Sequence, residues 1–205
     1  MTDRGDASWP PTTTTVVGAD WYARDISGEH HTGVAFVDVD MTEVTGDGAT
    51  FEDCAFRNVR FNASVHRDSA FTGCGFVRCT FFDTRFERCK LVGSRFQACT
   101  INLLTVVGGN WSFVGLAGAD LRSATFTGTR LREADLTGAQ CQGGTLRDLD
   151  LSGAWFERAD LTGCDLRGSD LSSLDPRTVE LRGAVVLVDQ AVGVAERLGL
   201  DVRAE

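Results

Sequence analysis

Large apolar residues recur at every fifth position over most of this chain. The series runs in one phase from Trp21 to Leu171, with Phe51 and its successors at its centre. Within the stretch after Phe51, only His66 and Cys141 are not large and apolar. A period of five fits neither an α-helix, whose period is 3.6, nor an alternating strand, whose period is two. A short fixed period indicates a repeat architecture, in which each unit packs on the next.

The position two residues before each large residue is small. The segment ADLTGCDLRGSDL, residues 159–171, shows the unit as small, Asp, Leu, polar, polar. Gly, Asp, Asn and Ser favour turns, so each five-residue side can bury two side chains and then turn a corner. Six of the seven cysteines fall in the small column: Cys54, Cys74, Cys79, Cys89, Cys99 and Cys164.

This unit resembles the A(D/N)LXX motif of pentapeptide-repeat proteins. The resemblance implies an all-β fold, a right-handed quadrilateral β-helix in which four pentapeptides make one square coil, here with a short C-terminal helix. Stacked coils would lie at the strand spacing of about 4.8 Å, so residues twenty apart should form ladders. We expect Phe56, Phe76 and Phe96 to stack in one ladder, and Phe61 and Phe81 in another.

The repeat divides the chain into three parts. We expect a disordered N-terminal tail at 1–18, the β-helix at 19–187, and a helix and tail at 188–205 for capping and dimerisation. Within 186–200, Asp189 would be the N-cap of a short helix and Gly199 its C-terminal stop. A solenoid needs its open end covered, and the same apolar surface could join two copies. The expected dimer interface comprises Val186, Ala191, Val192, Ala195 and Leu198.

Two places depart from the pattern. His66 stands where a large apolar residue is due, which favours a local bulge or register adjustment over a catalytic role. The segment 101–113 puts Leu104 in the small column and Trp111 in the large one. We interpret it as a distorted coil or a change of turn type.

The cysteines and the rest of the sequence predict no catalytic or metal chemistry. The cysteines occupy the slot otherwise filled by Ala or Ser, so they are interpreted as small buried apolar residues. Seven thiols without paired CxxC spacing indicate neither a zinc site nor a disulfide framework. No Ser/His/Asp set, P-loop or GxGxxG appears. We therefore expect a protein that is not an enzyme and has no cofactor or metal.

The overall charge restricts the partners. A formal net charge of −9 argues against unaided nucleic-acid binding and favours a basic partner. No apolar run approaches the roughly 18 residues of a membrane span. The polar N-terminal stretch MTDRGDASWPPTTTT lacks the apolar core of a signal peptide, which predicts a cytoplasmic protein without membrane contact.

The acidic charge increases toward the C-terminal end. Residues 101–175 hold ten acidic residues and six Arg, whereas residues 36–100 hold nine acidic and eight basic residues. On a rigid rod, outward carboxylates could stand in for DNA phosphates, although Asp side chains also stabilise turns. The candidate partner-binding residues are Asp120, Asp135, Asp150, Asp160, Asp165 and Asp170.

A narrower resemblance suggests the partner. The stretches HRDSAF, LVGSRFQAC and VVGGN are similar to the mycobacterial fluoroquinolone-resistance branch of the family, and more distantly to the Qnr proteins. That branch implies a homodimer that binds DNA gyrase, through its DNA-binding A subunit, in place of DNA. It also implies protection from quinolones or other topoisomerase poisons, including as self-immunity. No Qnr-type inserted loop is evident, so inhibition is the firmer expectation. The alternative is a repeat scaffold that binds an unrelated basic protein.

Overall fold

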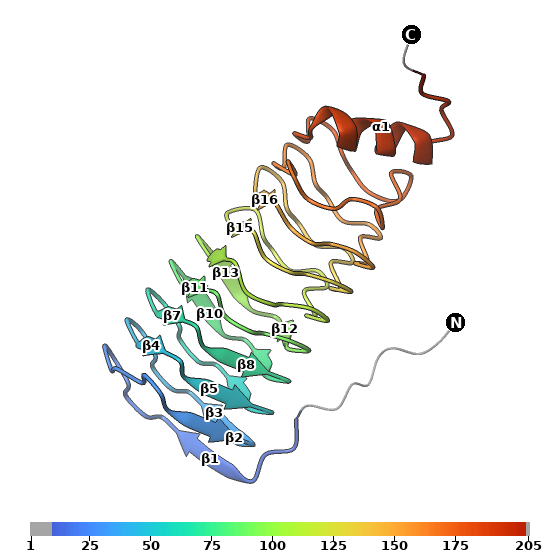
Figure 1. Ribbon diagram of the computed structural model, residues 1–205. Helices are drawn as coiled ribbons and strands as arrows, with labels where there is room; N and C mark the ends of the chain where they lie inside the picture. Colours follow the sequence, from blue (N-terminus) through green and yellow to red (C-terminus); the bar gives the residue numbers. More distant parts are fainter. Residues whose placement is uncertain (1–9, 204–205) are drawn as a thin grey trace.

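The chain winds into a rod of stacked coils that ends in one helix (Figure 1). The structure is a computed structural model and describes residues 10–203. Each residue pairs in parallel with the residue twenty positions later, as Phe36 does with Phe56 and Phe56 with Phe76. Twenty residues per coil and four sheets give four five-residue sides. The predicted all-β quadrilateral helix is confirmed, with α1 (Val188–Arg197) across its C-terminal end.

The four sides of the coil stack into four faces, which we number in chain order. In one coil, residues 34–38 belong to face 1, 39–43 to face 2, 44–48 to face 3 and 49–53 to face 4. Face 1 contains β1 (Thr14–Val17), β3 (Val34–Val37), β6 (Ala55–Arg57), β9 (Gly75–Val77) and β12 (Arg95–Gln97). Face 2 contains β10 (Thr80–Phe82) and β13 (Thr100–Asn102).

The other two faces complete the square. Face 3 contains β4 (Thr45–Asp47), β7 (Val65–Arg67), β11 (Arg85–Glu87), β14 (Thr105–Val107), β15 (Thr125–Thr127) and β16 (Thr145–Arg147). Face 4 contains β2 (His30–Thr32), β5 (Thr50–Glu52) and β8 (Ala70–Thr72). Beyond these strands, isolated parallel bridges continue each face with the same offset of twenty residues. The fold therefore fixes which face every side chain occupies.

Aromatic ladders fill the N-terminal half of the core. The rings of Phe56 and Phe76 stack at 4.9 Å with 7° between their planes, and Phe76 stacks on Phe96 at 4.7 Å. Phe61 and Phe81 stack at 5.0 Å. Rings on adjacent faces meet edge to face, and this geometry and the offset stack are the two favoured aromatic arrangements. The ladders predicted from the sequence are confirmed.

The cysteines lie in the small column of this core. All seven are free thiols, and all but the partly exposed Cys99 are buried. Burial raises the pKa of Cys89 to about 11 and that of Cys164 to about 12, so both thiols stay protonated at neutral pH. The Cys89 thiol donates to the carbonyl oxygen of His66 at 3.3 Å. The interpretation of the cysteines as small buried residues is confirmed.

The two expected irregularities have different outcomes. His66 lies within β7, in register with Gly46 and Phe86, so the expected bulge or register adjustment is wrong. The segment 101–113 keeps its register, with Leu104 and Trp111 both buried, so it is not a distorted coil; the expected alternative, a change of turn, is confirmed at Gly108 and Gly109, which both have a positive φ. Gly109, two positions before Trp111, has a φ of 86° and lies against the backbone of Cys89 in the preceding coil. A Cβ on Gly109 would lie 2.2 Å from the carbonyl oxygen of Cys89.

The ends of the chain also differ from expectation. Strand β1 lies within the segment expected to be a disordered tail and pairs with β3, so that expectation is wrong for Thr14–Val17. Residues 1–9 lie outside the described part of the chain. Asp189 is not the N-cap of α1, because the helix begins at Val188 and Leu187 is the N-cap. Gly199 follows the C-cap with a φ of 93°, which confirms the predicted stop.

Gln190 takes over the role expected of Asp189. Its Oε1 accepts the N–H of Leu187 at 2.7 Å, and its Nε2 donates to the carbonyl oxygens of Leu166 and Ser169 at 2.8 and 2.7 Å. One amide therefore caps the helix and attaches it to the last coils. Within residues 10–203, no helix has the length and apolar character needed to span a bilayer.

Candidate partner-binding surface

The six candidate aspartates project outward but do not share a face. Asp170 is exposed and the others are half-buried. They are distributed as Asp120 and Asp160 on face 2, Asp150 and Asp170 on face 4, Asp135 on face 1, and Asp165 on face 3. Because faces 2 and 4 are opposite sides of the square, the structure brings together two pairs and not one cluster of six.

The ladder on face 2 is the longer of the two. Parallel bridges join Asp120 to Gln140, Gln140 to Asp160, and Asp160 to Glu180. On face 4, the backbone N–H of Asp170 donates to the carbonyl oxygen of Leu149 at 2.8 Å, which places Asp170 one coil beyond Asp150. The sequence missed Glu180 as a member of the face 2 ladder, although its position twenty residues after Asp160 could have identified it.

Every candidate aspartate also holds its own turn. Each carboxylate accepts the backbone N–H of the residue two positions later, at distances between 2.9 Å for Asp160 and 3.4 Å for Asp150. The other four bonds have the same offset: Asp120 with Arg122, Asp135 with Thr137, Asp165 with Arg167, and Asp170 with Ser172. One oxygen of each carboxylate is therefore committed to the turn, as the sequence indicated.

Arginine pairing divides the six carboxylates into two groups. Asp120 pairs with Arg122 at 2.5 Å, and Asp165 pairs with Arg167 at 2.7 Å. The Arg167 guanidinium, which donates to Asp165, is the main cause that lowers the pKa of this carboxyl to about 2. The third pair joins Asp150 to Arg132 of the preceding coil at 2.5 Å. These pairs neutralise much of the local charge. The second group consists of Asp135, Asp160 and Asp170, and within residues 10–203 none of these three forms an ion pair with an arginine.

The sequence analysis did not predict these ion pairs, although the residue spacing could have indicated two of them. Arg122 and Arg167 each follow an outward Asp by two positions within one pentapeptide, where both side chains leave the same face of the rod. The Arg132 pair spans 18 residues and connects two coils, so it depends on the coil geometry.

The net charge differs strongly among the faces. Face 2 carries seven acidic and three basic residues, and face 4 carries six acidic and three basic residues. Face 3 has six of each, and face 1 has four acidic and five basic residues. The excess of negative charge is thus confined to two opposite faces, and face 2 has the larger share.

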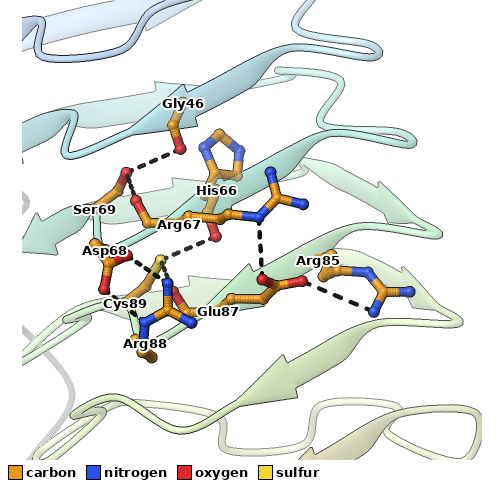
Figure 2. A network of polar contacts seen from close by, with 9 residues as sticks. All are labelled: Gly46, His66, Arg67, Asp68, Ser69, Arg85, Glu87, Arg88 and Cys89. Carbon is orange, nitrogen blue, oxygen red and sulfur yellow. Dashed lines mark hydrogen bonds and ion pairs between the residues drawn. The ribbon is translucent and has the colours of Figure 1, made fainter.

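Face 3 neutralises itself through contacts between coils (Figure 2). Arg67 Nε donates to Glu87 at 3.1 Å, and Arg85 lies 3.9 Å from the same carboxylate. Arg88 Nε donates to Asp68 at 2.8 Å. Each acidic group in this network meets an arginine, so face 3 offers a basic partner little net charge.

An acidic hollow lies beside α1. Asp150 and Asp170 line it together with Asp148, Asp189 and Arg132, and its volume is about 500 Å³. The sequence had not assigned Asp148 or Asp189 to the acidic surface. Among the described residues, no group of three or more His, Cys, Asp or Glu is arranged to hold a metal ion. Its lining makes the hollow a part of the acidic surface.

An apolar groove separates α1 from the last coils. Its volume is about 240 Å³, and four of the five expected dimer-interface residues line it: Val186, Ala191, Ala195 and Leu198. Val192 does not line the groove. The remaining lining residues were not predicted: Leu171, Leu181, Ala184, Val194 and Leu200. The groove marks the apolar end of the rod.

Comparisons with known proteins agree with the twenty-residue coil. The sequence model described as "Pentapeptide repeat region" matches residues 79–156, and "Pentapeptide repeats (8 copies)" matches residues 146–175. The chain is a pentapeptide-repeat protein. A third model, "SV2A/B/C luminal domain", matches residues 26–101 of this pentapeptide-repeat protein.

Individual relatives resemble it in sequence or in fold. The pentapeptide repeat protein MfpA of Mycobacterium tuberculosis is 40% identical over 97 residues, which span 47% of this chain and 53% of MfpA. The match thus covers about half of the curated relative. Full-length QnrB1, a plasmid-mediated fluoroquinolone resistance protein, superposes with a TM-score of 0.63 at 22% identity, over 92% of this chain and 99% of QnrB1. A trypsin-treated R167E form of QnrB1 gives 0.60 at 24% identity, over 94% and 99%. These structures share the fold.

Proposed function

We propose that this pentapeptide-repeat protein is a DNA mimic that binds DNA gyrase, a type II topoisomerase, in place of DNA and inhibits it. The observation that supports the proposal is the ladder of carboxylates on face 2, where Asp120, Asp160 and Glu180 project from one side of a rigid rod. Coils about 4.8 Å apart place Asp120 and Asp160 roughly 10 Å apart. Duplex DNA carries a charge every ~1.7 Å, so the mimicry is partial.

The resemblance to MfpA and QnrB1 supports gyrase as the partner. QnrB1 is described as a plasmid-mediated fluoroquinolone resistance protein. A basic groove that normally holds DNA attracts an acidic rod through long-range electrostatics. We assign the contact to the A subunit of gyrase, which binds the DNA. Protection of gyrase from quinolones or other poisons, including as self-immunity, then follows from displacement of the DNA that the drug needs.

Dimerisation through the C-terminal end belongs to the same proposal. The groove beside α1 is apolar, and Val188 on the same helix is 84% exposed. Such surface is unfavourable in water and favours a partner. A second copy placed end to end would join two rods into one of twice the length, with the acidic hollows close to the junction. The homodimer would therefore present its charge near the middle.

A supercoiling assay with matched charge variants tests the proposal. Asp160→Asn with Glu180→Gln removes two charges of face 2 and keeps the turn bond of Asp160 available. Two surface charges together are worth about 1 kcal/mol, so inhibition should weaken about fivefold. The control, Glu52→Gln with Asp53→Asn, makes the same charge change on face 4 in the N-terminal half. Wild-type inhibition should also fade as salt increases.

Equal inhibition by both double variants, or an effect that salt does not change, would contradict DNA mimicry. Drug protection needs a separate measurement, the gyrase-mediated DNA cleavage that a quinolone stabilises. The wild-type protein should reduce this cleavage at concentrations that also inhibit supercoiling.

One observation favours the alternative of a scaffold for another basic protein. Asp120, Asp150 and Asp165 are paired with arginines, which makes the surface less similar to a row of phosphates. A scaffold would bind neither the isolated A subunit nor the complete gyrase, and it would leave supercoiling unchanged. Direct binding to the immobilised A subunit therefore distinguishes the two functions.

A further inference from the structure

Asp160 differs from the other candidate aspartates in the groups that hold its carboxylate. Its Oδ1 accepts a hydrogen bond from the backbone N–H of Thr162 at 2.9 Å, and its Oδ2 accepts one from Gln142 Nε2 at 2.7 Å. Within residues 10–203, it is the one member of the six whose two carboxylate oxygens are both bonded to uncharged donors. The carboxylate is therefore fixed in place and keeps its negative charge.

Gln142 reaches Asp160 from the preceding coil, across 18 residues of sequence. Arginines use the same offset on two other faces: Arg132 lies 2.5 Å from Asp150 on face 4, and Arg147 lies 3.8 Å from Asp165 on face 3. The coil geometry thus brings the side chain at this offset to the outward carboxylate of the next coil. An arginine at position 142 would neutralise Asp160 in the same way, whereas the glutamine holds it without adding a charge.

The glutamine at this position has a cost that an arginine would not have. Gln142 Oε1 is buried, and within residues 10–203 it has no hydrogen-bond partner. The amide cannot turn over to expose this oxygen, because Oε1 would then face the Asp160 carboxylate, which only accepts hydrogen bonds. A buried acceptor without a partner lowers stability, and an arginine has no acceptor to bury. A costly residue where a cheaper one fits indicates a role beyond folding.

The charged neighbours of Asp160 do not change this picture. Glu180 is paired with Asp160 from the next coil, and Arg182 follows two positions later. Arg182 attracts the Asp160 carboxylate from a distance, and in the described part of the chain the two form no ion pair. The hydrogen bonds from Thr162 are the main cause that lowers the pKa of Asp160, and the bond from Gln142 lowers it further. The pKa of Asp160 therefore reports whether Gln142 holds the carboxylate.

We propose that Gln142 is a positioning residue for the contact with the partner, because it fixes the Asp160 carboxylate on face 2 without neutralising it. A carboxylate that is already fixed loses little side-chain freedom when a basic group of the partner binds to it. An arginine at position 142 would instead satisfy the charge within the rod. The identity of the partner as gyrase rests on the proposed function above.

Two variants of Gln142 separate the charge of Asp160 from its position. Gln142→Arg keeps a donor beside Asp160 and neutralises its charge, so supercoiling inhibition should weaken about threefold. Gln142→Leu leaves the charge and removes the donor, so inhibition should weaken about twofold, because the freed carboxylate must be ordered on binding. An NMR pH titration of the Asp160 carboxyl carbon checks the contact itself. The pKa of Asp160 should rise in the leucine variant and fall in the arginine variant.

Gln97→Arg is a matched control for the added charge. Gln97 is exposed on face 1 and has the same place in its pentapeptide as Gln142, directly after an inward residue. The residue 18 positions later is Gly115, so no carboxylate lies at the end of this offset. The control should leave both inhibition and the Asp160 titration unchanged.

Three results would overturn the role of Gln142. These are an Asp160 titration that neither variant changes, unchanged inhibition by Gln142→Arg, and an equal loss of inhibition with Gln97→Arg. If Asp160→Asn with Glu180→Gln weakens inhibition and Gln142→Arg does not, only the role of Gln142 is wrong. If none of the variants differs from wild type, or if the wild-type protein does not inhibit, the DNA-mimic function is wrong with it.

Discussion

Replacing His66 by phenylalanine should make the protein more stable and less sensitive to acid. The imidazole occupies a position of the apolar ladder, fully buried and stacked on Phe86 at 5.1 Å. Ser64 Oγ donates to the carbonyl oxygen of Phe61 at 2.6 Å, so it accepts from His66 Nε2 at 3.1 Å. The ring therefore carries its proton on Nε2, and Nδ1 is a buried acceptor without a hydrogen-bond partner.

The magnitude follows from two separate terms. Burial lowers the pKa of His66 to about 3, whereas an unfolded histidine has a pKa of about 6.5. Below pH 6.5 the unfolded chain thus binds a proton at this histidine, whereas the folded chain does not. The contribution of the neutral histidine to the free energy of unfolding is therefore fully present above pH 6.5 and is lost as the pH decreases. Between pH 7.5 and pH 5.5, which is one unit below the unfolded pKa, the free energy of unfolding decreases by about 1.4 kcal/mol. At neutral pH, removing the unsatisfied Nδ1 should raise the free energy of unfolding by about 1–3 kcal/mol.

Urea unfolding of the wild type and of His66→Phe at pH 7.5, 6.5 and 5.5 measures both terms. His30 and His31 are present in both proteins, so the difference between the two pH profiles isolates His66. We expect the variant to be more stable at pH 7.5 and its advantage to grow by about 1.4 kcal/mol at pH 5.5.

Two results would refute this reasoning. Parallel pH profiles would mean that His66 titrates alike in both states and is not buried in the ladder. A variant that is less stable at every pH would mean that a phenylalanine ring does not fit between Gly46 and Phe86, and that the register of β7 is wrong.

Two further predictions concern the C-terminal end. Val188→Arg should convert the proposed homodimer into a folded monomer, because it places a charge on an exposed apolar residue outside the groove; a wild-type protein that sediments as a monomer at micromolar concentration would contradict this. Gln190→Ala should lower the free energy of unfolding by about 1–3 kcal/mol and release α1, because three hydrogen bonds are lost. Unchanged amide exchange in α1 would refute the role of Gln190.

The core was predictable because its geometry depends only on the period. Once the large residues repeat every five positions, the register of twenty residues and the ring ladders follow, and Phe56, Phe76 and Phe96 were placed correctly. The fold also tolerates a polar ring at a position where the pattern requires a large apolar residue. His66 was expected to disturb the register, but an imidazole has nearly the shape of a phenyl ring and stacks in its place.

The surface was less predictable, because it depends on pairs of side chains that the period does not determine. Asp150 was identified as an outward carboxylate, but its pairing with Arg132 needs the actual distance between two coils. The same holds for the helix cap. Asp189 has the right chemistry for an N-cap, and the position of the helix start, set by the contacts of Gln190, decided against it.

The separation of core from surface explains how this fold can acquire a binding face. A change in an outward column moves charge or apolar area along one face and leaves the inward ladders untouched. Face 3 and face 2 share the same backbone, yet the Arg67–Glu87 and Arg88–Asp68 contacts neutralise face 3, whereas face 2 keeps an excess of acidic residues despite its Arg60–Asp40 and Arg122–Asp120 pairs. A binding face can therefore arise in this fold without any change to the buried residues that hold the coils together.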